Sequence, residues 1–194
     1  MGMDVSGLNP EINESITKFP ILEKWDAINW GDRDKEEWKK EEDKYWEEHS
    51  KFHKANAGVY FRNNCWWWRP LWIYCHQIAP ELISEETYTS GTYNDGAGLD
   101  AKDAKKLGIK LLVKIEDGST KGYKEERDLC LEALPDDDCN VCNNNNRGNS
   151  KKKDCHACKG KGTQQNWNRH YPFSVDNVKE FAHFCIQSGG FEIW

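Results

Sequence analysis

The sequence predicts an α+β fold that is mainly helical, with a few short strands and one loop or hairpin held by cysteines. Three observations predict this fold. Several segments carry apolar residues at helical spacing between start and stop signals, and short aromatic or β-branched runs lie between them. Eight cysteines include two closely spaced pairs. With 194 residues, the chain suits a single domain over 1–194.

The first strong helix is expected over residues 34–55. Asp34 offers an N-cap, aromatic residues recur every seven positions, and Gly58 follows the last turn. The segment is rich in charged residues, and we interpret 34–57 as a charged helical insertion in the domain.

Four further helices are expected along the rest of the chain. One has Pro70 in its first turn, two span 100–117 and 120–134, and the last begins at Ser174. Asp100 is the expected N-cap of the second of these helices, because Asp accepts a hydrogen bond from a backbone N–H in the first turn.

The remaining segments are typical of strands or irregular structure. Residues 1–33 are expected to be irregular or briefly helical, and residues 84–98 are expected to form a hydroxyl-rich loop. Short strands are expected at 59–62 and 191–194.

Charge and composition limit the partners and the cellular location that we expect for the protein. The net charge of −6 argues against nonspecific duplex DNA binding, which depends on Lys and Arg neutralising phosphates. No apolar run reaches the length of a membrane span, and the first residues lack the pattern of a signal peptide. We therefore expect a cytoplasmic protein, in a bacterial cell or an infected host cell, without a membrane partner. In that setting eight cysteines favour metal binding over disulfides.

The strongest motif is a pair of Cys-x-x-Cys sequences in a module over 136–163. Cys139 and Cys142 form the first pair, and Cys155 and Cys158 form the second. Two residues between thiolates let one tight turn direct both sulfurs at a common centre, and two such turns complete the tetrahedral shell of structural Zn(II). A structural zinc ion is therefore the predicted cofactor, with all four positions filled by sulfur and none open for catalysis.

The aromatic segment between residues 60 and 72 is the candidate ligand site. Consecutive Trp residues cannot all share one helical face, and Trp beside Arg and paired Asn suits recognition of a planar polar ligand. The alternative is a core built from Trp side chains, with Arg69 packed over an aromatic face. Together with a polar loop downstream, the candidate ligand-binding residues are Arg62, Asn63, Asn64, Trp66, Trp67, Trp68, Arg69, Trp72, Tyr93, Asn94 and Asp95.

The downstream loop has two interpretations. Asn94-Asp95-Gly96 is typical of a tight turn, since these residues readily adopt left-handed conformations. The hydroxyl-bearing residues around it would also suit the lining of a pocket. No Walker loop, nucleophile elbow, HExxH or GxGxxG occurs in the chain, so no catalytic residue is predicted.

The chain resembles a group of uncharacterised bacterial and phage proteins. The blocks that carry the resemblance are Met1-Gly2-Met3-Asp4-Val5, the Tyr60-to-Trp72 segment, Tyr93-Asn94-Asp95-Gly96, the two cysteine pairs, and Tyr171-Pro172-Phe173-Ser174 through Phe191. The resemblance leaves out about residues 10–57. It implies an intracellular bacterial or viral setting and transfers no activity.

A shorter resemblance concerns the cysteine module. Residues 155–162 are similar to a CxxCxGxG repeat of the DnaJ-type zinc module, whereas Asn143 to Asn146 replace the glycines in the first half. The module is accordingly expected to be a zinc ribbon or DnaJ-like knuckle. The likeness covers about 24 residues, and chaperone function is not carried over from it.

Three functions remain open from the sequence. The first is a non-enzymatic, zinc-stabilised binding protein that captures a small polar ligand, such as a nucleotide-like host-defence signal. The second is an interaction module that regulates or inhibits a host protein or binds nucleic acid through Lys151 to Lys153, Lys159 and Lys161. The third is a small hydrolase using Asp95 with a His or Arg. The oligomeric state is not predicted.

Overall fold

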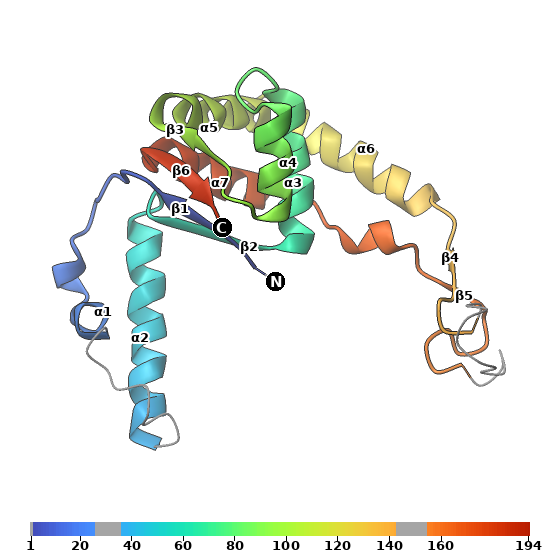
Figure 1. Ribbon diagram of the computed structural model, residues 1–194, viewed down its shortest axis with the longest axis horizontal. Coiled ribbons are helices and arrows are strands. Elements are labelled where there is room, and N and C mark those ends of the chain that lie inside the picture. Colours follow the sequence, from blue (N-terminus) through green and yellow to red (C-terminus); the bar gives the residue numbers. More distant parts are fainter. Residues whose placement is uncertain (1, 26–35, 143–154) are drawn as a thin grey trace.

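A computed structural model describes residues 2–25, 36–142 and 155–194, and it confirms the α+β fold class. Within these residues a four-stranded sheet packs against helices that connect and follow its strands (Figure 1). Two appendages project from opposite ends of this body, a long helix at one end and the cysteine module at the other, and both reach downward in Figure 1.

The sheet is antiparallel throughout and has the order β2-β1-β6-β3. Its strands are β1 (Gly2–Gly7), β2 (Tyr60–Asn64), β3 (Gly98–Asp100) and β6 (Gly190–Ile193). The two expected strands are confirmed as β2 and β6. Residues 1–33 are expected to be irregular or briefly helical: Pro20–Trp25 do form a short helix, whereas Gly2–Gly7 form a strand instead. Strand β1 lies in the middle of the sheet and pairs with strands far away in sequence, so local turn signals do not reveal it.

Alternation along the strands gives the sheet one apolar and one polar face. Val5 lies opposite Phe61 on one side and Ile193 on the other, and all three are buried. Asp4 lies opposite Arg62 on the other face, where both side chains remain partly exposed. Because side chains of a strand alternate between faces, the core helices pack on the first face. Among the described residues, the polar face lies beside a helix only near Tyr60, whose ring contacts His53.

The described chain forms seven α-helices. They are α1 (Pro20–Trp25), α2 (Glu36–Ala55), α3 (Cys65–Ile78), α4 (Glu85–Tyr93), α5 (Ala101–Glu116), α6 (Ser119–Ala133) and α7 (Val175–Gln187). The helices expected over 100–117 and 120–134 are confirmed as α5 and α6, and Asp100 caps α5 by accepting from the N–H of Asp103 at 2.8 Å. Ser174 precedes α7 as expected, without a side-chain capping bond.

Helix α3 begins earlier than the sequence indicates. Asn64 accepts hydrogen bonds from the N–H groups of Trp66 and Trp67, at 3.0 and 3.1 Å, and so starts the helix at Cys65. Pro70 therefore lies inside the helix, and its expected place in the first turn is wrong. The extra turn at the start of α3 brings Trp68 into the core. The free energy gained by burying this side chain outweighs the cost of the backbone hydrogen bond that Pro70 cannot donate.

Residues 84–98 are not a loop, because most of them form α4 and the start of β3. Ser84 caps α4 by accepting from the N–H of Thr87, and Asn94 ends it in a left-handed conformation with a φ of 63°. Two core tryptophans donate indole N–H bonds to carbonyls of α4. These tertiary bonds stabilise a segment whose Thr, Ser and Gly content is unfavourable for a helix.

The core joins the sheet to α3, α5 and α7. Trp68 and Trp72 are fully buried and stacked, with ring centroids 5.3 Å apart and planes at 16°. Gly108 of α5 lies against α7 so closely that a Cβ would meet the Ala182 carbonyl at 2.6 Å. Such close helix packing requires glycine at this position, because any side chain would push α5 and α7 apart.

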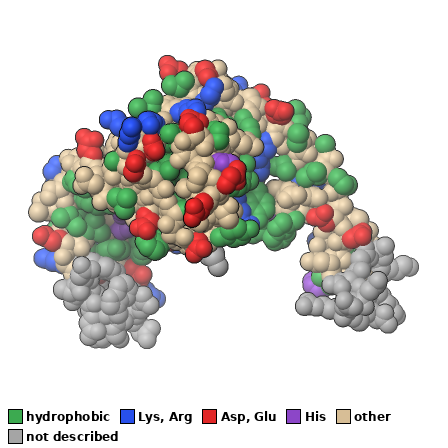
Figure 2. Space-filling view, turned by 45° about the horizontal axis from the view of Figure 1, so that its top comes forward, with side chains coloured by type: hydrophobic (Ala, Val, Ile, Leu, Met, Phe, Trp, Pro, Cys, Tyr) green, Lys and Arg blue, Asp and Glu red, His purple; other side chains and the backbone are tan. Residues whose placement is uncertain are grey.

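Helix α2 confirms the charged helix expected over 34–55, although Asp34 lies outside the described residues. Phe52 of this helix packs on Phe19, which directly precedes α1, with ring centroids 5.4 Å apart. None of the helices in the described ranges is long and apolar enough to cross a membrane. Acidic and basic side chains are interspersed on the face shown in Figure 2.

Candidate functional site

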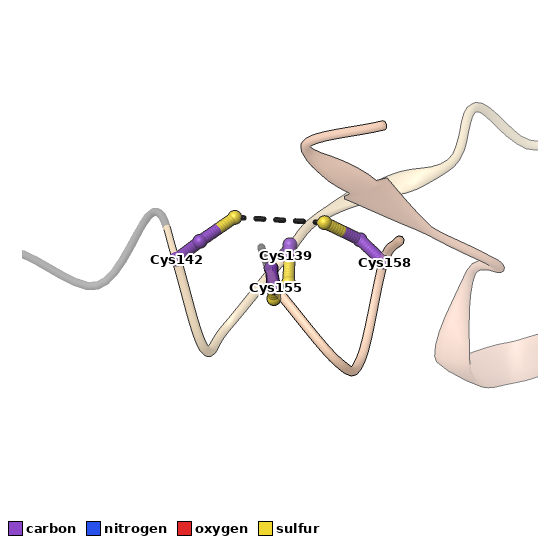
Figure 3. Close-up of side chains that lie close together, drawn as sticks. All are labelled: Cys139, Cys142, Cys155 and Cys158. Atoms are coloured by element: carbon purple, nitrogen blue, oxygen red, sulfur yellow. Dashed lines mark hydrogen bonds between the residues drawn. The ribbon is translucent and has the colours of Figure 1, made fainter. Parts of the chain in front are cut away.

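The four cysteines converge at the tip of the cysteine module. Strands β4 (Asp137–Asp138) and β5 (Thr163–Gln164) form a short hairpin, and each Cys-x-x-Cys pair lies in a turn beyond it. All four Sγ atoms lie within 4.8 Å of one another (Figure 3). The residues that the sequence selects as metal ligands are thus brought together, and they can hold a metal ion such as zinc.

The geometry of this cluster fits a tetrahedral metal centre. The Sγ atoms of Cys139 and Cys155 lie 3.7 Å apart, and those of Cys142 and Cys158 lie 3.6 Å apart. Zn–S bonds of about 2.3 Å at tetrahedral angles require sulfur separations of roughly 3.8 Å. The backbone N–H of Gly162 donates to Cys158 Sγ at 3.2 Å and is the main cause that lowers the pKa of this thiol to about 6. Thiolate, the form that binds metal, is favoured there.

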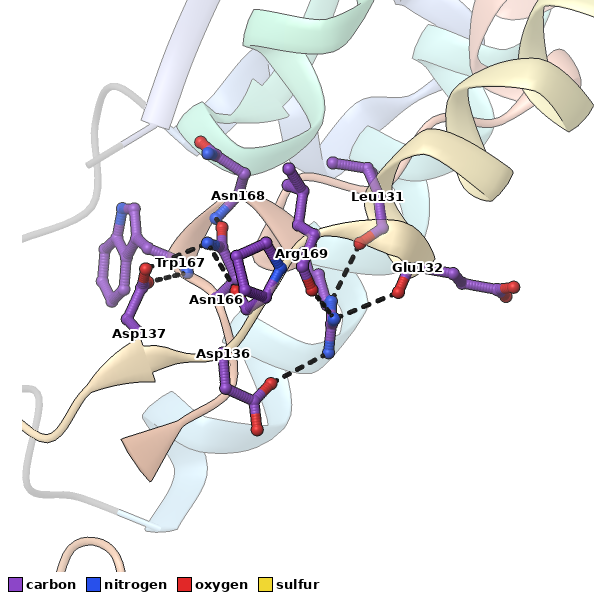
Figure 4. Close-up of polar contacts among 10 residues, drawn as sticks. Leu131, Glu132, Asp136, Asp137, Asn166, Trp167, Asn168 and Arg169 are labelled. Carbon is purple, nitrogen blue, oxygen red and sulfur yellow. Dashed lines mark hydrogen bonds and ion pairs between the residues drawn. The ribbon is translucent and has the colours of Figure 1, made fainter. Parts of the chain in front are cut away.

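Arg169 anchors the module to the body of the protein. It lies in the 3-10 helix η4 (Trp167–His170), which follows β5, and its guanidinium donates to the carbonyl oxygens of Leu131, Glu132 and Leu134 at the end of α6 (Figure 4). It also pairs with Asp136 at 3.2 Å. A cation at a helix C-terminus satisfies carbonyls that have no partner within the helix. Arg169 thus holds η4 against the end of α6, together with Asp137, which accepts from the N–H of Trp167 at 2.8 Å.

A hollow of about 390 Å³ lies between α3, α6 and η4. Its lining residues are Arg69, Pro70, Ile73, Arg127, Leu131, Trp167, Asn168 and Tyr171. We call it the arginine cavity. Its wall is apolar on the side of α3 and α6 and aromatic on the side of η4, and two guanidinium groups lie in it.

Arg69 and Arg127 each use only some of their N–H groups in hydrogen bonds to described residues. Nη1 of Arg69 donates to the Tyr171 hydroxyl at 2.8 Å, and Nη2 of Arg127 donates to the Tyr171 carbonyl at 2.6 Å. Nε of Arg69 and Nη1 of Arg127 are buried and have no hydrogen-bond partner among the described residues. Within the same residues neither guanidinium is paired with a carboxylate. Two positive charges thus share one cavity without a described counter-charge.

The predicted ligand residues separate into groups. Trp68 and Trp72 belong to the core, so the Trp-core alternative applies to them. Arg69 lines the arginine cavity. Trp66 is partly exposed and packs at the edge of the cavity, with its ring centroid 5.1 Å from that of Trp167 and 4.9 Å from that of Tyr171.

The other predicted residues lie elsewhere. Arg62 pairs with Asp4 on the polar face of the sheet, and Asn63 donates to Asn177 at 3.1 Å. Asn64 is the cap of α3, and Trp67 on the next turn is partly buried.

The structure places Tyr93, Asn94 and Asp95 at the C-terminal end of α4. Tyr93 is 71% exposed, and Asp95 is exposed with its N–H bonded to the Ser90 carbonyl. This arrangement agrees with the turn interpretation of the segment. None of the three is among the described residues that line the hollows beside α2 and η4.

A second hollow, of about 420 Å³, adjoins the first at Trp167. Lys159 and Lys161 of the cysteine module line it together with His170. Trp167 lies between the two hollows, borders both, and is 58% exposed.

Sequence reasoning did not select Arg127, Trp167, Asn168 or Tyr171 for the site. They lie far from the Trp-rich segment in the chain, and only folding of α6 and η4 onto α3 brings them together. A signal was nevertheless present, because Trp167-Asn168-Arg169-His170 repeats the Trp, Asn and Arg composition of the 60–72 segment.

No family model, curated protein or solved structure matches the chain.

Proposed function

We propose that this protein is a zinc-stabilised binding protein that captures a small planar anion in the arginine cavity. The observation that carries the proposal is the pair of guanidinium groups, Arg69 and Arg127, which line one cavity without a carboxylate partner among the described residues. Cys139, Cys142, Cys155 and Cys158 hold one Zn(II) ion in this proposal, and the ion stabilises a module that has little core of its own.

The charge of the ligand follows from the two guanidinium groups that line the cavity. Two like charges in one cavity add repulsion, which a bound anion replaces with attraction. A phosphate or carboxylate accepts parallel N–H bonds from guanidinium groups, so it satisfies both arginines at once.

The shape of the ligand follows from the other residues that line the arginine cavity. Trp167 offers an exposed indole face, and Pro70, Ile73 and Leu131 form an apolar floor. Asn168 adds an amide that can both donate and accept hydrogen bonds. A planar ring with a polar edge and an attached anion fits these groups, and nucleotides have this combination. The resemblance to bacterial and phage proteins makes nucleotide signals of host defence one class of ligand to test.

Calorimetric titration with nucleoside monophosphates tests the proposal. We expect binding of at least one of AMP, GMP, CMP and UMP, weaker binding of the matching nucleoside, and a loss of more than about tenfold in affinity in Arg127→Met, since charged hydrogen bonds contribute about 1.5–3 kcal/mol each. Arg62→Met is the matched control, because Arg62 lies on the polar face of the sheet and 65% of its side chain is exposed. Binding that Arg127→Met leaves unchanged would overturn the assignment of the cavity.

A second candidate function is binding of single-stranded nucleic acid. The observation that favours it is that the exposed Trp167 lines both hollows, the second of which is also lined by Lys159 and Lys161. Bases stack on aromatic rings irrespective of sequence, and flanking cations contact the phosphates. Lys151 to Lys153, which the sequence also suggests, lie outside the described residues.

Fluorescence anisotropy with a labelled oligonucleotide distinguishes the two candidates. A single-strand site predicts affinity that rises with oligonucleotide length, falls with salt, and decreases in the double variant Lys159→Gln/Lys161→Gln. A small-ligand site predicts that mononucleotides compete fully and that the lysine variant binds them as the unmodified protein does.

A further inference from the structure

Helix α2 carries two histidines one turn apart on the side that faces strand β2. The Nε2 atoms of His49 and His53 lie 3.0 Å apart, and their ring centroids lie 4.2 Å apart. The ring of His53 also packs on Tyr60 of β2, with centroids 5.3 Å apart. Residues four apart share one face of a helix, so the backbone of α2 brings both rings to the same side and their Nε2 atoms together.

We propose that His49 and His53 form a second metal site, which binds a transition-metal ion such as Zn(II) or Ni(II) independently of the cysteine cluster. Imidazole nitrogen suits Zn, Cu, Fe and Ni, and pairs of His four residues apart on a helix are a recurring zinc-binding pattern. Zn–N bonds of about 2.05 Å at a tetrahedral angle place the two nitrogens roughly 3.3 Å apart. The observed pair needs to open by only about 0.3 Å to reach that separation.

Space for the remaining ligands lies on both sides of the pair. His49 and His53 both line a hollow of about 630 Å³ between α2 and the polar face of the sheet. His53 also lines a hollow of about 580 Å³ that extends to α7, where Glu180 and His183 border it. An ion on the two Nε2 atoms thus keeps coordination positions that water or a small ligand can occupy, which makes this an open site, unlike the closed shell of four sulfurs.

The protons of the pair can rearrange to accept an ion. In the metal-free pair one neutral ring donates from Nε2 to Nε2 of the other ring. A metal ion needs both Nε2 atoms as acceptors, so the donating ring moves its proton to Nδ1 and both rings stay neutral. Nδ1 of His53 is buried without a hydrogen-bond partner among the described residues, so no described group holds the proton on Nε2 and none accepts it at Nδ1.

The test uses zinc itself on the whole protein. Protein that holds one equivalent of Zn(II) by elemental analysis is titrated with further Zn(II) by calorimetry. We expect a second equivalent to bind, and its affinity to fall by more than about tenfold in His49→Gln and in His53→Gln, since even losing an outer-shell partner of a ligand costs 10–100-fold. His76→Gln is the control, because His76 lies on α3 and stacks on Tyr88.

A measurement on the unmodified protein tests the site without relying on variants, which could lose metal binding because they misfold. Nitrogen-15 NMR of the imidazoles should show the Nε2 resonances of both His49 and His53 shifting together with the second equivalent. A chain that takes up one ion only would overturn the proposal. So would a second ion that binds equally well to both glutamine variants and leaves these two resonances in place.

Discussion

The guanidinium of Arg69 donates a hydrogen bond of 2.8 Å to the hydroxyl of Tyr171, and these residues lie 102 positions apart in the chain. Tyr171 follows directly after η4, which Arg169 fixes to the end of α6. The Arg69–Tyr171 bond therefore ties α3 to the segment that leaves the cysteine module. The cavity proposed to bind the anion is built where these two parts of the chain meet.

Removing one thiol should release the metal without unfolding the body. In Cys155→Ser we expect loss of the bound zinc by elemental analysis, because a closed tetrahedral site needs all four sulfurs. Amide hydrogen exchange should accelerate in residues 136–142 and 155–164, while exchange in α5 and α7 stays slow. Cys130→Ser is the control, since Cys130 is exposed and outside the cluster. Full zinc retention in Cys155→Ser would count against the four-sulfur site.

Arg169→Met should weaken both stability and ligand binding. The substitution removes three hydrogen bonds to carbonyl oxygens at the end of α6, and we expect a loss of about 2 kcal/mol or more in the free energy of unfolding. Trp167 would lose its fixed position, so affinity for the anion should fall as well. Arg62→Met, which removes only a surface ion pair, should cost less than about 1 kcal/mol. Urea denaturation of both variants measures the difference, and equal losses would refute the anchoring role.

Trp68→Ala should be among the most destabilising single substitutions. Trp68 is fully buried, stacks on Trp72 and donates to the Gly91 carbonyl at 2.8 Å. Replacing a buried Trp by Ala costs about 3–5 kcal/mol, whereas Trp167→Ala, at a 58% exposed position, should stay within about 1 kcal/mol. Thermal or urea unfolding checks the contrast. Similar losses for the two variants would contradict the division of the tryptophans into core and site.

His53 should titrate far below an ordinary histidine. Burial, with the neighbouring His49 as a second cause, lowers the pKa of His53 to about 4. Unfolding exposes the ring and returns its pKa to about 6.5, so between pH 6.5 and 4 the unfolded chain binds the proton more tightly and stability falls as pH falls. The other titratable or charged groups that border its two hollows are Lys54, Tyr60, Arg62, Glu180 and His183.

The check is an NMR titration of the imidazole resonances in protein that carries one equivalent of zinc. His53 should remain neutral at pH 5.5, and His53→Gln should flatten the dependence of the unfolding free energy on pH between 6.5 and 4. Protonation of His53 near the ordinary histidine pKa would show that the ring is not buried as described.

Local signals account for the parts of the fold that the sequence predicts. Helix α5 has a capping Asp100 and amphipathic spacing, and Gly118 separates it from α6; these signals can all be read within a short window. The cysteine cluster was predictable for the same reason, because two residues of spacing nearly determine where both sulfurs point.

The parts that sequence reasoning missed depend on contacts between distant residues. Strand β1 is defined by partners near residues 60 and 190, and α4 is stabilised by the indoles of Trp68 and Trp72. The arginine cavity is the same kind of feature, since Arg69 and Arg127 meet at Tyr171 only after α6 packs onto the body. Residue propensity and hydrophobic periodicity describe local preferences for helix or strand, and they carry little information about contacts between distant residues.

Native mass spectrometry of protein purified gently from cells, repeated after denaturation, tests the central claim most directly. We expect a mass increment for zinc and a released small anion with an aromatic ring. The same preparation of the double variant Arg69→Met/Arg127→Met should keep the zinc and lose the anion. A ligand that survives in the double variant, or a chain that carries zinc and gains no mass on incubation with any nucleoside monophosphate, would contradict anion capture in the arginine cavity.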